Sequence, residues 1–225
     1  MARTTVSITT QVWGEQYGQF TSRWWESVKT LNRKPDEIVL VGSTTDPAGL
    51  MSSVPDWVDV PVVKIQTECD YMQEWATVAV HACSSEWIAV MPVDDQWAPT
   101  ALDAIDQADG DLIIDKTQFL QGGEWPATWD TARSGDRYFA PAGIAPFRRN
   151  LIPVWDMIPN DCHWNDYVFY LLLAKHNVKV HHTNNLRMIH DLGYTHETMS
   201  GVMMDSAKRM KADRQLITIR EKLGI

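Results

Sequence analysis

Two adjacent carboxylates, Asp94 and Asp95, are the residues of this chain whose types and spacing most directly suggest chemistry. They follow the apolar run Trp87–Met91, which has the length and composition of a buried strand. Ligands bind at the carboxyl ends of strands in open α/β sheets, and two acids placed there repel each other unless they share a cation or a proton. The pair therefore indicates a cation-dependent ligand site. A solvated loop with an aspartate that caps a helix is the alternative, because acids favour helix amino termini.

A further acid, Asp166, stands beside Asn165 at the start of a run with helical spacing. The apolar positions of this run are Trp164, Val168, Leu171 and Leu172. They predict a helix with a buried face, which places Asp166 in the first turn. An acid at that point is stabilised by the helix dipole, so the spacing alone does not separate a capping role from a catalytic one.

The elements that must position the acid pair follow from the hydrophobic periodicity of the first hundred residues. Strands are predicted at residues 5–10, 37–41, 60–65 and 87–91, and helices at residues 16–31, at residues 72–82 and after Pro99. This alternation predicts parallel pairing with right-handed crossovers, which is a common nucleotide-binding arrangement. The chain contains neither G-x-G-x-x-G nor G-x-x-x-x-G-K, which excludes a dinucleotide fingerprint and a P-loop.

The remainder of the chain predicts fewer elements. Strands are expected at Leu112–Ile114 and Val178–His182, and a terminal helix at His196–Leu223 that buries Met203, Ala207, Met210 and Ile217. The basic residues of that helix are expected to be solvated, with contact to an anionic polymer, lipid surface or nucleic acid as the alternative. We predict one α/β domain over residues 1–225 with a mostly parallel central sheet flanked by helices. Residues 1–100 would form a nucleotide-binding half, residues 101–195 a second half, and residues 196–225 the terminal helix.

Composition limits the classes of protein that fit. A chain of 225 residues with 44% hydrophobic residues can bury a substantial core. No apolar run approaches the roughly 20 residues needed to cross a membrane, and no signal peptide is recognisable. Cys69, Cys83 and Cys162 are widely spaced and form no C-x-x-C pair, which predicts reduced thiols, a cytoplasmic location and no zinc cluster. The net charge of -9 argues weakly against general nucleic-acid affinity.

Three segments have a recognisable order: VSITTQVW at residues 6–13, DEIVLVGSTTD at residues 36–46 and SEWIAVMPVDD at residues 85–95. They resemble the segments VSIIIPVYN, EIIVVDDGSTD and GEYIAFLDADD of the GT-A glycosyltransferases of the family 2 type. The likeness in order and spacing extends to about residue 195. The resemblance implies a GT-A (Rossmann-like) fold and a nucleotide-diphosphate sugar as donor.

The resemblance also assigns the donor site. Asp94 matches the acid that binds the metal on the diphosphate, and Asp95 stands beside it. At the end of the first strand, Gln11 and Trp13 match positions that contact the nucleotide, with Trp13 in place of the common tyrosine beside the base. These four residues are therefore expected to bind the donor.

Two departures from the family pattern affect nucleotide recognition. The first acid of the family's D-x-D is replaced by Pro92, and the strand-two aspartate that reads uracil is replaced by Gly42 or Ser43. Glu68 or Asp70 would have to supply the missing contact. Nucleotide binding is thus better indicated than nucleotide identity, for which UDP is the expectation.

The sugar and acceptor sides are assigned to the middle of the chain. Gly143 lies in a segment, Ala140–Arg149, that resembles the one where family members line the sugar pocket with small residues. A tight turn followed by a basic helix start is the alternative. Trp125 and Trp129 stand in a loop rich in turn formers, where exposed rings could stack on an acceptor sugar. A place in the core is the alternative for both tryptophans.

The catalytic and metal-binding residues complete the resemblance. Family members carry Glu-Asp or Asp-Asp where this chain has Asn165 and Asp166, and the second acid is their general base, so the resemblance makes Asp166 the base. Several GT-A enzymes have a histidine ligand near the position of His190. An imidazole together with Asp94 suits Mn²⁺ or Mg²⁺, whereas a merely hydrogen-bonded histidine is the alternative.

Together these features predict a metal-dependent, inverting glycosyltransferase that uses a UDP-sugar and an acceptor hydroxyl. A protein, a glycan, a small molecule or modified DNA would each serve as acceptor. One alternative is a sugar-phosphate nucleotidyltransferase, although residues 11–16 contain no basic residue of the kind its first loop carries. The other alternative is a non-catalytic nucleotide- or glycan-binding module, in which Pro92 and Gly42 record lost activity.

Overall fold

The computed structural model describes residues 3–12, 15–46, 49–120, 122–124, 129, 143–190 and 206–224. The strands are β1 (Val6–Val12), β2 (Glu37–Gly42), β3 (Val62–Gln66), β4 (Trp87–Val90), β5 (Gln96–Trp97), β6 (Leu112–Phe119), β7 (Phe147–Arg148) and β8 (Val180–His190). The helices are α1 (Gly18–Thr30), α2 (Met72–Ala82), α4 (Ile152–Trp155), α5 (Asn165–Lys175) and α7 (Ser206–Leu223). Short 3₁₀ turns are found at η1 (Glu15–Tyr17), η2 (Ile105–Gln107) and η4 (Arg149–Leu151).

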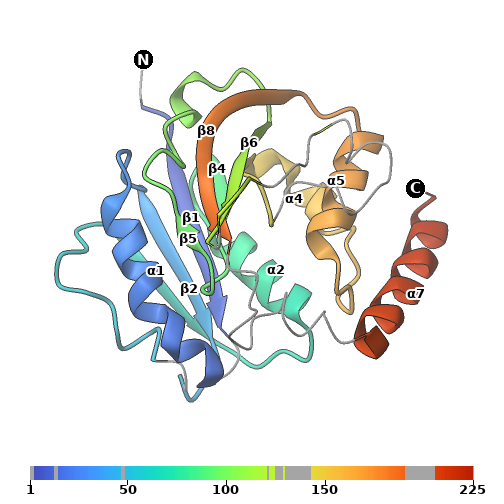
Figure 1. Cartoon of the computed structure of the whole chain (residues 1–225), viewed down its shortest axis with the longest axis horizontal. Coiled ribbons are helices and arrows are strands. Elements are labelled where there is room, and N and C mark those ends of the chain that lie inside the picture. The colour runs from blue at the N-terminus through green and yellow to red at the C-terminus, as the bar shows by residue number, and fades with distance from the viewer. Residues whose placement is uncertain are drawn as a thin grey trace.

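The described strands form one sheet with the order β3-β2-β1-β4-β7-β6-β8-β5 (Figure 1). The first four strands are all parallel, as the βαβαβ pattern predicts. The other half is mixed, because β7 is antiparallel to both β4 and β6, and β5 is antiparallel to β8. The α/β class is therefore confirmed, whereas the expectation of a mostly parallel sheet holds only for the first half.

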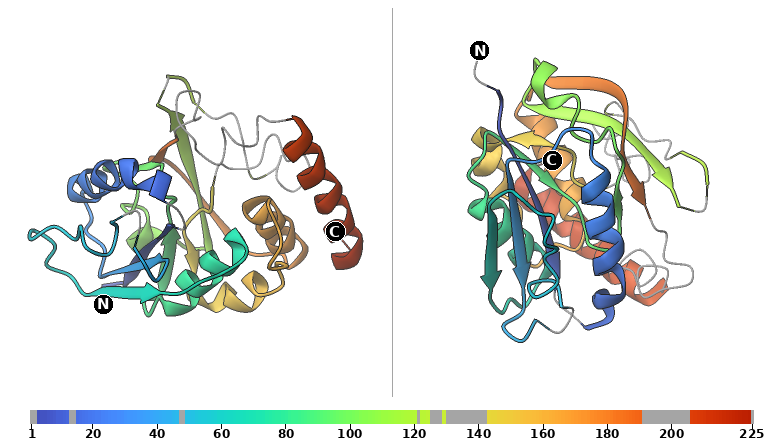
Figure 2. Two further views of the ribbon diagram at one scale, coloured as in Figure 1. Left: turned by 90° about the horizontal axis from the view of Figure 1, so that it is seen from below. Right: turned by 90° about the vertical axis from the view of Figure 1, so that its left-hand side faces the viewer.

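Strand alternation divides the core into two clusters, one on each face of the sheet. Ile38 and Leu40 of β2 pack toward α1, where Trp24 and Trp25 are fully buried. Val39 of the same strand packs toward α2, α4 and α5. Figure 2 shows the arrangement, with α1 on one side of the strands and α2 and α4 on the other. Burial on both faces fixes the register of β1, β2 and β4, and with it the place where their carboxyl ends meet.

The segment after the acid pair does not form the helix predicted after Pro99. Residues 98–107 form successive turns, in which the amides of Ala101, Asp103 and Ile105 each bond the carbonyl three residues earlier. The reason is tertiary pairing, because Ala98 donates its N–H to the carbonyl of Arg187 in β8. This bond holds the start of the segment at the edge of the sheet, which opposes the growth of a regular helix from it.

The strand predicted at residues 178–182 is much longer than expected, and its continuation matters for the site. β8 runs to His190 and pairs with β6 along its length and with β5 at its end. Thr183, Asn184 and Asn185 in the middle of β8 interrupt the apolar pattern, so the continuation of the strand beyond them was not predicted. His190 is thus the last residue of β8 and not part of a following loop.

The terminal helix α7 lies at the rim of the molecule beside α5 (Figure 1). The prediction that Met210 and Ile217 are buried is wrong, since these side chains are 54% and 59% exposed. Leu216 and Ile219 face the core instead, because a different stripe of the helix packs on α5. The side chains of Met203 and Ala207 lie outside the described residues. No described helix is long and apolar enough to cross a membrane.

Candidate active site

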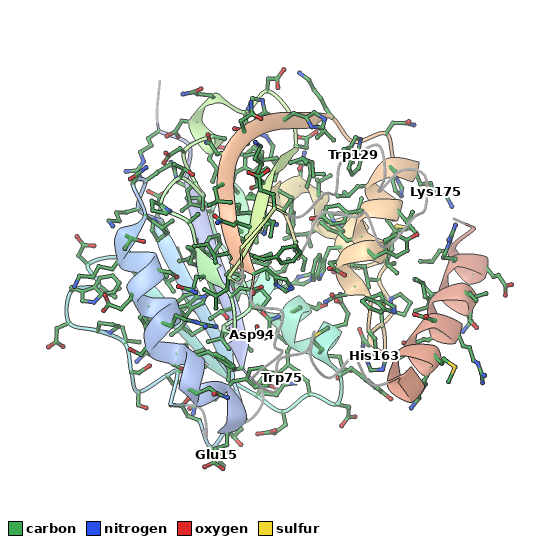
Figure 3. All side chains as sticks on the ribbon, viewed as in Figure 1. Glu15, Trp75, Asp94, Trp129, His163 and Lys175 are labelled. Atoms are coloured by element: carbon green, nitrogen blue, oxygen red, sulfur yellow. The ribbon has the colours of Figure 1, made fainter. Side chains whose placement is uncertain are left out.

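The acid pair follows β4, near the carboxyl ends of the parallel strands. Asp94 is 8% and Asp95 3% exposed, so neither belongs to a solvated loop. The backbone carbonyl of Asp94 accepts a hydrogen bond of 2.5 Å from Nη2 of Arg23 on α1. Figure 3 labels Asp94 between the ribbons of α1 and α2. Two buried adjacent carboxylates require nearby positive charge, and the next strands supply it.

His190 is one group that can carry such a charge. Gln96 of β5 pairs with Ile189 of β8, which places the preceding Asp95 opposite the following His190. Nδ1 of His190 lies 2.9 Å from Oδ1 of Asp95. Burial lowers the pKa of His190, but the carboxylates of Asp95, Asp94 and Asp166 outweigh burial and hold this pKa above its ordinary value. The imidazole is therefore surrounded by the acids that sequence reasoning selected.

Asp166 is the third acid and lies in the first turn of α5. Its Oδ1 accepts the N–H of Tyr167 at 2.7 Å, and its own N–H is bound by the side chain of Asn165 at 2.8 Å. Burial raises the pKa of Asp166 above the ordinary value of an aspartate, although the Tyr167 and Gly143 amides and His190 oppose the rise. A raised pKa in a confined site suits a group that must take up a proton.

Gly143 is held beside Asp166 by residues that sequence reasoning missed. It adopts φ +60, and its carbonyl accepts a hydrogen bond of 2.7 Å from the hydroxyl of Tyr170 on α5. The next carbonyl, that of Ile144, accepts from Nη1 of Arg187 at 3.1 Å. The one signal in the sequence was Arg187 itself, a cation placed between apolar residues of a β-rich run.

Arg187 forms a buried ion pair with Asp115 of β6, with Nε and Oδ1 2.8 Å apart. Both side chains are almost inaccessible to solvent. Burial raises the pKa of Asp115 to about 6 in spite of the guanidinium. The charge of Arg187 also reaches Asp95. Charges of alternating sign thus run from Asp115 through Arg187 and Asp95 to His190.

Gln11 is the described candidate at the end of β1. Its side chain is buried, and among the described residues its Oε1 has no hydrogen-bond partner. A buried amide oxygen without a partner is costly, and a ligand N–H or O–H would satisfy it. Gln11 therefore has the surroundings expected of a donor-binding residue. The neighbouring candidate Trp13 lies outside the described residues.

Gly42, at the position of the missing strand-two acid, is the last residue of β2. A Cβ on Gly42 would lie 3.0 Å from Cε of Met51, so a larger residue there requires Met51 to move. Glu68 accepts hydrogen bonds from both N and Oγ1 of Thr44, at 2.9 and 2.7 Å. Both bonds lower the pKa of Glu68, and the bond from the hydroxyl of Thr44 has the larger effect. Of the two acids considered for the missing contact, Glu68 is the one bonded to the loop after β2.

The acceptor candidates receive less support. Trp129 is buried, and its ring packs edge-on against Tyr170 with centroids 6.4 Å apart. Figure 3 shows Trp129 on the α5 side of the molecule, away from Asp94. An inaccessible ring cannot stack on a sugar in this conformation. Trp125 lies outside the described residues, so its acceptor role remains a prediction.

A divalent cation fits these residues only as part of a shared site. Within the described ranges, no three His, Cys, Asp or Glu side chains are grouped closely enough to hold a metal ion by themselves. Mg²⁺ commonly uses one or two carboxylates and takes its other ligands from substrate phosphates and water. The buried carboxylate of Asp94, with His190 nearby, provides such an open set. The donor chemistry is therefore compatible with Mn²⁺ or Mg²⁺ bound together with a diphosphate.

Comparison with known proteins gives a fold but no sequence family. No protein-family model matches the chain, and no curated protein matches it in sequence. Among solved structures, S. aureus TarS 1-349 in complex with UDP-GlcNAc has a TM-score of 0.67 at 16% identity. The mannosyltransferase PcManGT from Pyrobaculum calidifontis, in complex with GDP-Man and Mn²⁺, has a TM-score of 0.58 at 17% identity.

Both alignments cover most of this chain but only part of the similar structure. The alignment with TarS 1-349 covers 87% of this chain and 60% of that chain, and the alignment with PcManGT covers 83% and 57%. The chain thus spans about three fifths of each of these two structures. Its fold is of the GT-A type found in glycosyltransferases, as the order of its sequence segments predicted.

Proposed function

We propose that the chain is an inverting glycosyltransferase that transfers a sugar from a nucleotide-diphosphate sugar, most simply a UDP-sugar, to an acceptor hydroxyl. The observation that carries this proposal is the convergence of Asp94, Asp95, Asp166 and His190 at one edge of a GT-A sheet. These residues come from three distant parts of the chain. Placing three acids together destabilises a fold, which favours a functional reason for their position. The similar structures in complex with UDP-GlcNAc, UDP and GDP-Man support a donor of this class.

Each residue has a defined part in the proposed reaction. Gln11 and Trp13 contact the nucleotide, and Gly143 leaves room for the sugar. Asp94 and His190 would hold Mn²⁺ or Mg²⁺, and such a cation would offset the negative charge that develops on the leaving diphosphate. Asp95 fixes the imidazole of His190 through its 2.9 Å contact. Asp166 takes the proton of the acceptor hydroxyl as that oxygen attacks the anomeric carbon.

A panel of nucleotides tests the donor without knowledge of the acceptor. Thermal unfolding is followed with UDP, UDP-GlcNAc, UDP-glucose and GDP-mannose, each in Mn²⁺ and in EDTA. A ligand present at 100 times its dissociation constant stabilises by roughly 2.7 kcal/mol, which raises the melting temperature of a chain of this size by about 5–11 °C. Stabilisation by a UDP compound that requires Mn²⁺ supports the proposal. A chain that responds to no nucleotide contradicts it.

Hydrolysis of the bound donor then separates an enzyme from a binding module. Many transferases pass their sugar slowly to water, so release of UDP from UDP-GlcNAc is measured for wild type and for Asp166→Asn. Loss of release in the variant, with nucleotide stabilisation kept, assigns catalysis to this site. Stabilisation without release in either protein favours the non-catalytic module. Formation of pyrophosphate from UTP and a sugar phosphate would instead identify a nucleotidyltransferase.

A further inference from the structure

Three consecutive backbone units beside the site are held by buried side chains. The hydroxyl of Tyr170 donates to the carbonyl of Gly143 at 2.7 Å and accepts the N–H of Ala145 at 2.8 Å. Between them, Nη1 of Arg187 donates to the carbonyl of Ile144 at 3.1 Å. Tyr170 and Arg187 are both fully buried, so no solvent competes for these bonds. The conformation of residues 143–145 is therefore set from α5 and β8.

The first of these units also contacts the proposed base. The N–H of Gly143 is hydrogen-bonded to the carboxylate of Asp166. The same residue thus offers its carbonyl to Tyr170 and its amide to Asp166, both of which belong to α5. Gly143 has φ +60, a conformation that is open to glycine, so its place is set by these two hydrogen bonds and not by its own backbone preference. A change at the hydroxyl of Tyr170 is accordingly transmitted to the carboxylate of Asp166.

We propose that Tyr170 is a positioning residue for the reaction: by fixing Gly143, its hydroxyl aims the amide that orients the carboxylate of Asp166. This inference rests on the proposed function, since it takes Asp166 as the base. In that step the acceptor proton passes to Asp166, the acceptor oxygen bonds to the anomeric carbon, and the bond to the diphosphate oxygen breaks. Tyr170 exchanges no proton and touches no substrate.

The ring of Tyr170 can be kept while its hydroxyl is removed. Its ring packs against Trp129 and Phe169, with centroids 6.4 Å away in each case. Tyr170→Phe preserves these contacts and leaves the carbonyl of Gly143 and the amide of Ala145 without their partner. Ser7→Ala is the matched control, because Oγ of Ser7 also donates one bond, to Glu37 at 2.5 Å, and accepts one, from the Ser85 amide at 3.2 Å. Ser7 is buried near the start of β1, away from the carboxyl ends of the strands.

The kinetic test uses UDP-GlcNAc hydrolysis. A displaced catalytic group costs up to about 100-fold in rate, so Tyr170→Phe is expected to lower kcat by roughly 10- to 100-fold. KM for UDP-GlcNAc should change by less than about twofold, because the donor contacts are untouched. Ser7→Ala should keep its kcat even if it melts at a lower temperature. In an Asp166→Asn background, Tyr170→Phe should have no further effect on kcat, since the two residues act through one contact.

A second readout needs no activity. In ¹⁵N-labelled protein, the Gly143 amide should exchange slowly with solvent in wild type and in Ser7→Ala, and much faster in Tyr170→Phe. A Gly143 amide that stays protected in Tyr170→Phe, or a kcat that stays at the wild-type value, overturns the proposal. A wild-type protein that hydrolyses no donor while its Gly143 amide behaves as expected refutes the proposed function, and with it the catalytic role of Tyr170, but not the anchoring of Gly143.

Discussion

Nδ1 of His190 lies 2.9 Å from Oδ1 of Asp95, so the last residue of β8 is joined to the residue that precedes β5. The pairing of β5 with β8 creates this contact. Because Gln96 lies opposite Ile189, the residue before Gln96 and the residue after Ile189 also lie opposite each other. A histidine that gives one ring nitrogen to a carboxylate has its orientation and tautomer fixed. Asp95 is thus best understood as a partner of His190, while Asp94 is the acid proposed to bind the cation.

The first prediction concerns Asp94. Without a cation, a diphosphate brought beside Asp94 and Asp95 meets two like charges and should be rejected. Asp94→Asn is expected to lose most of the Mn²⁺-dependent stabilisation by UDP while it keeps the wild-type far-UV circular dichroism spectrum. Equal binding of UDP in EDTA and in Mn²⁺, measured by isothermal titration calorimetry, would show that the metal role is wrong.

The second prediction concerns His190. Removing a metal ligand weakens metal binding without necessarily removing catalysis, so His190→Ala should need a higher Mn²⁺ concentration for half-maximal UDP-GlcNAc hydrolysis. At saturating Mn²⁺ its rate should come closer to the wild-type rate. His81→Ala is the control, because His81 forms a half-exposed pair with Asp156 at 2.7 Å, on the surface. An unchanged Mn²⁺ titration in His190→Ala would leave His190 with a structural role only.

The sequence was informative where one local pattern determined the outcome. The strands and helices of the first hundred residues were predicted because apolar residues recur with a clear period and both faces of β1, β2 and β4 are buried. The order of segments was enough to indicate the GT-A fold, and it placed Asp94, Asp166 and His190 in one region.

Tertiary pairing explains what the sequence did not reveal. Whether residues 98–107 form a helix depends on the bond between Ala98 and Arg187, which joins segments far apart in the chain. The pair of Asp115 with Arg187 was not predicted for the same reason, since nothing local identifies Asp115 as the partner of Arg187. The sequence predicted the wrong buried face for α7. Polar and apolar residues are spread around this helix with little amphipathic contrast, so packing on α5 decides which stripe is buried.

The third prediction concerns stability. Arg187→Met removes the partner of Asp115 and leaves a buried carboxylate, which typically destabilises a protein by about 3–5 kcal/mol. Urea unfolding at pH 7.5 should show this loss, whereas His81→Ala should change the free energy of unfolding by less than about 0.5 kcal/mol. Arg187→Met combined with Asp115→Leu should recover part of the loss. A single Arg187→Met variant as stable as wild type would mean that the pair does not hold β6 and β8 together.

The fourth prediction is a pH dependence. A general base must be ionised, and burial raises the pKa of Asp166 above the ordinary 3.8. Activity should therefore be lost as the pH falls through this raised pKa, so the acid limb of kcat for UDP-GlcNAc hydrolysis should lie above pH 3.8. Circular dichroism at each pH separates this limb from acid unfolding. A rate that stays constant down to the pH at which the fold is lost would contradict the role of Asp166 as the ionised base.

The last prediction joins Asp166 to the stereochemistry of the reaction. Direct displacement requires a base on the face opposite the leaving diphosphate, and a carboxylate in the first turn of α5 is rigidly held for that task. General-base catalysis contributes about 10²–10⁴-fold, so Asp166→Asn should lower kcat by a factor in that range. Because the side chains are nearly isosteric, stabilisation by UDP should be unchanged. Asn165 cannot compensate, since an amide does not accept a proton at neutral pH.

The product of this reaction gives a separate check on the same residue. With an α-linked donor, NMR of the sugar released or transferred at early times should show the β anomer, before mutarotation mixes the two forms. Asn165→Asp is a useful companion variant, because it restores the acid pair of the family pattern beside an intact Asp166 and should keep the inverted product. Retention of the α configuration, or a near-normal kcat in Asp166→Asn, would remove Asp166 from the role of base.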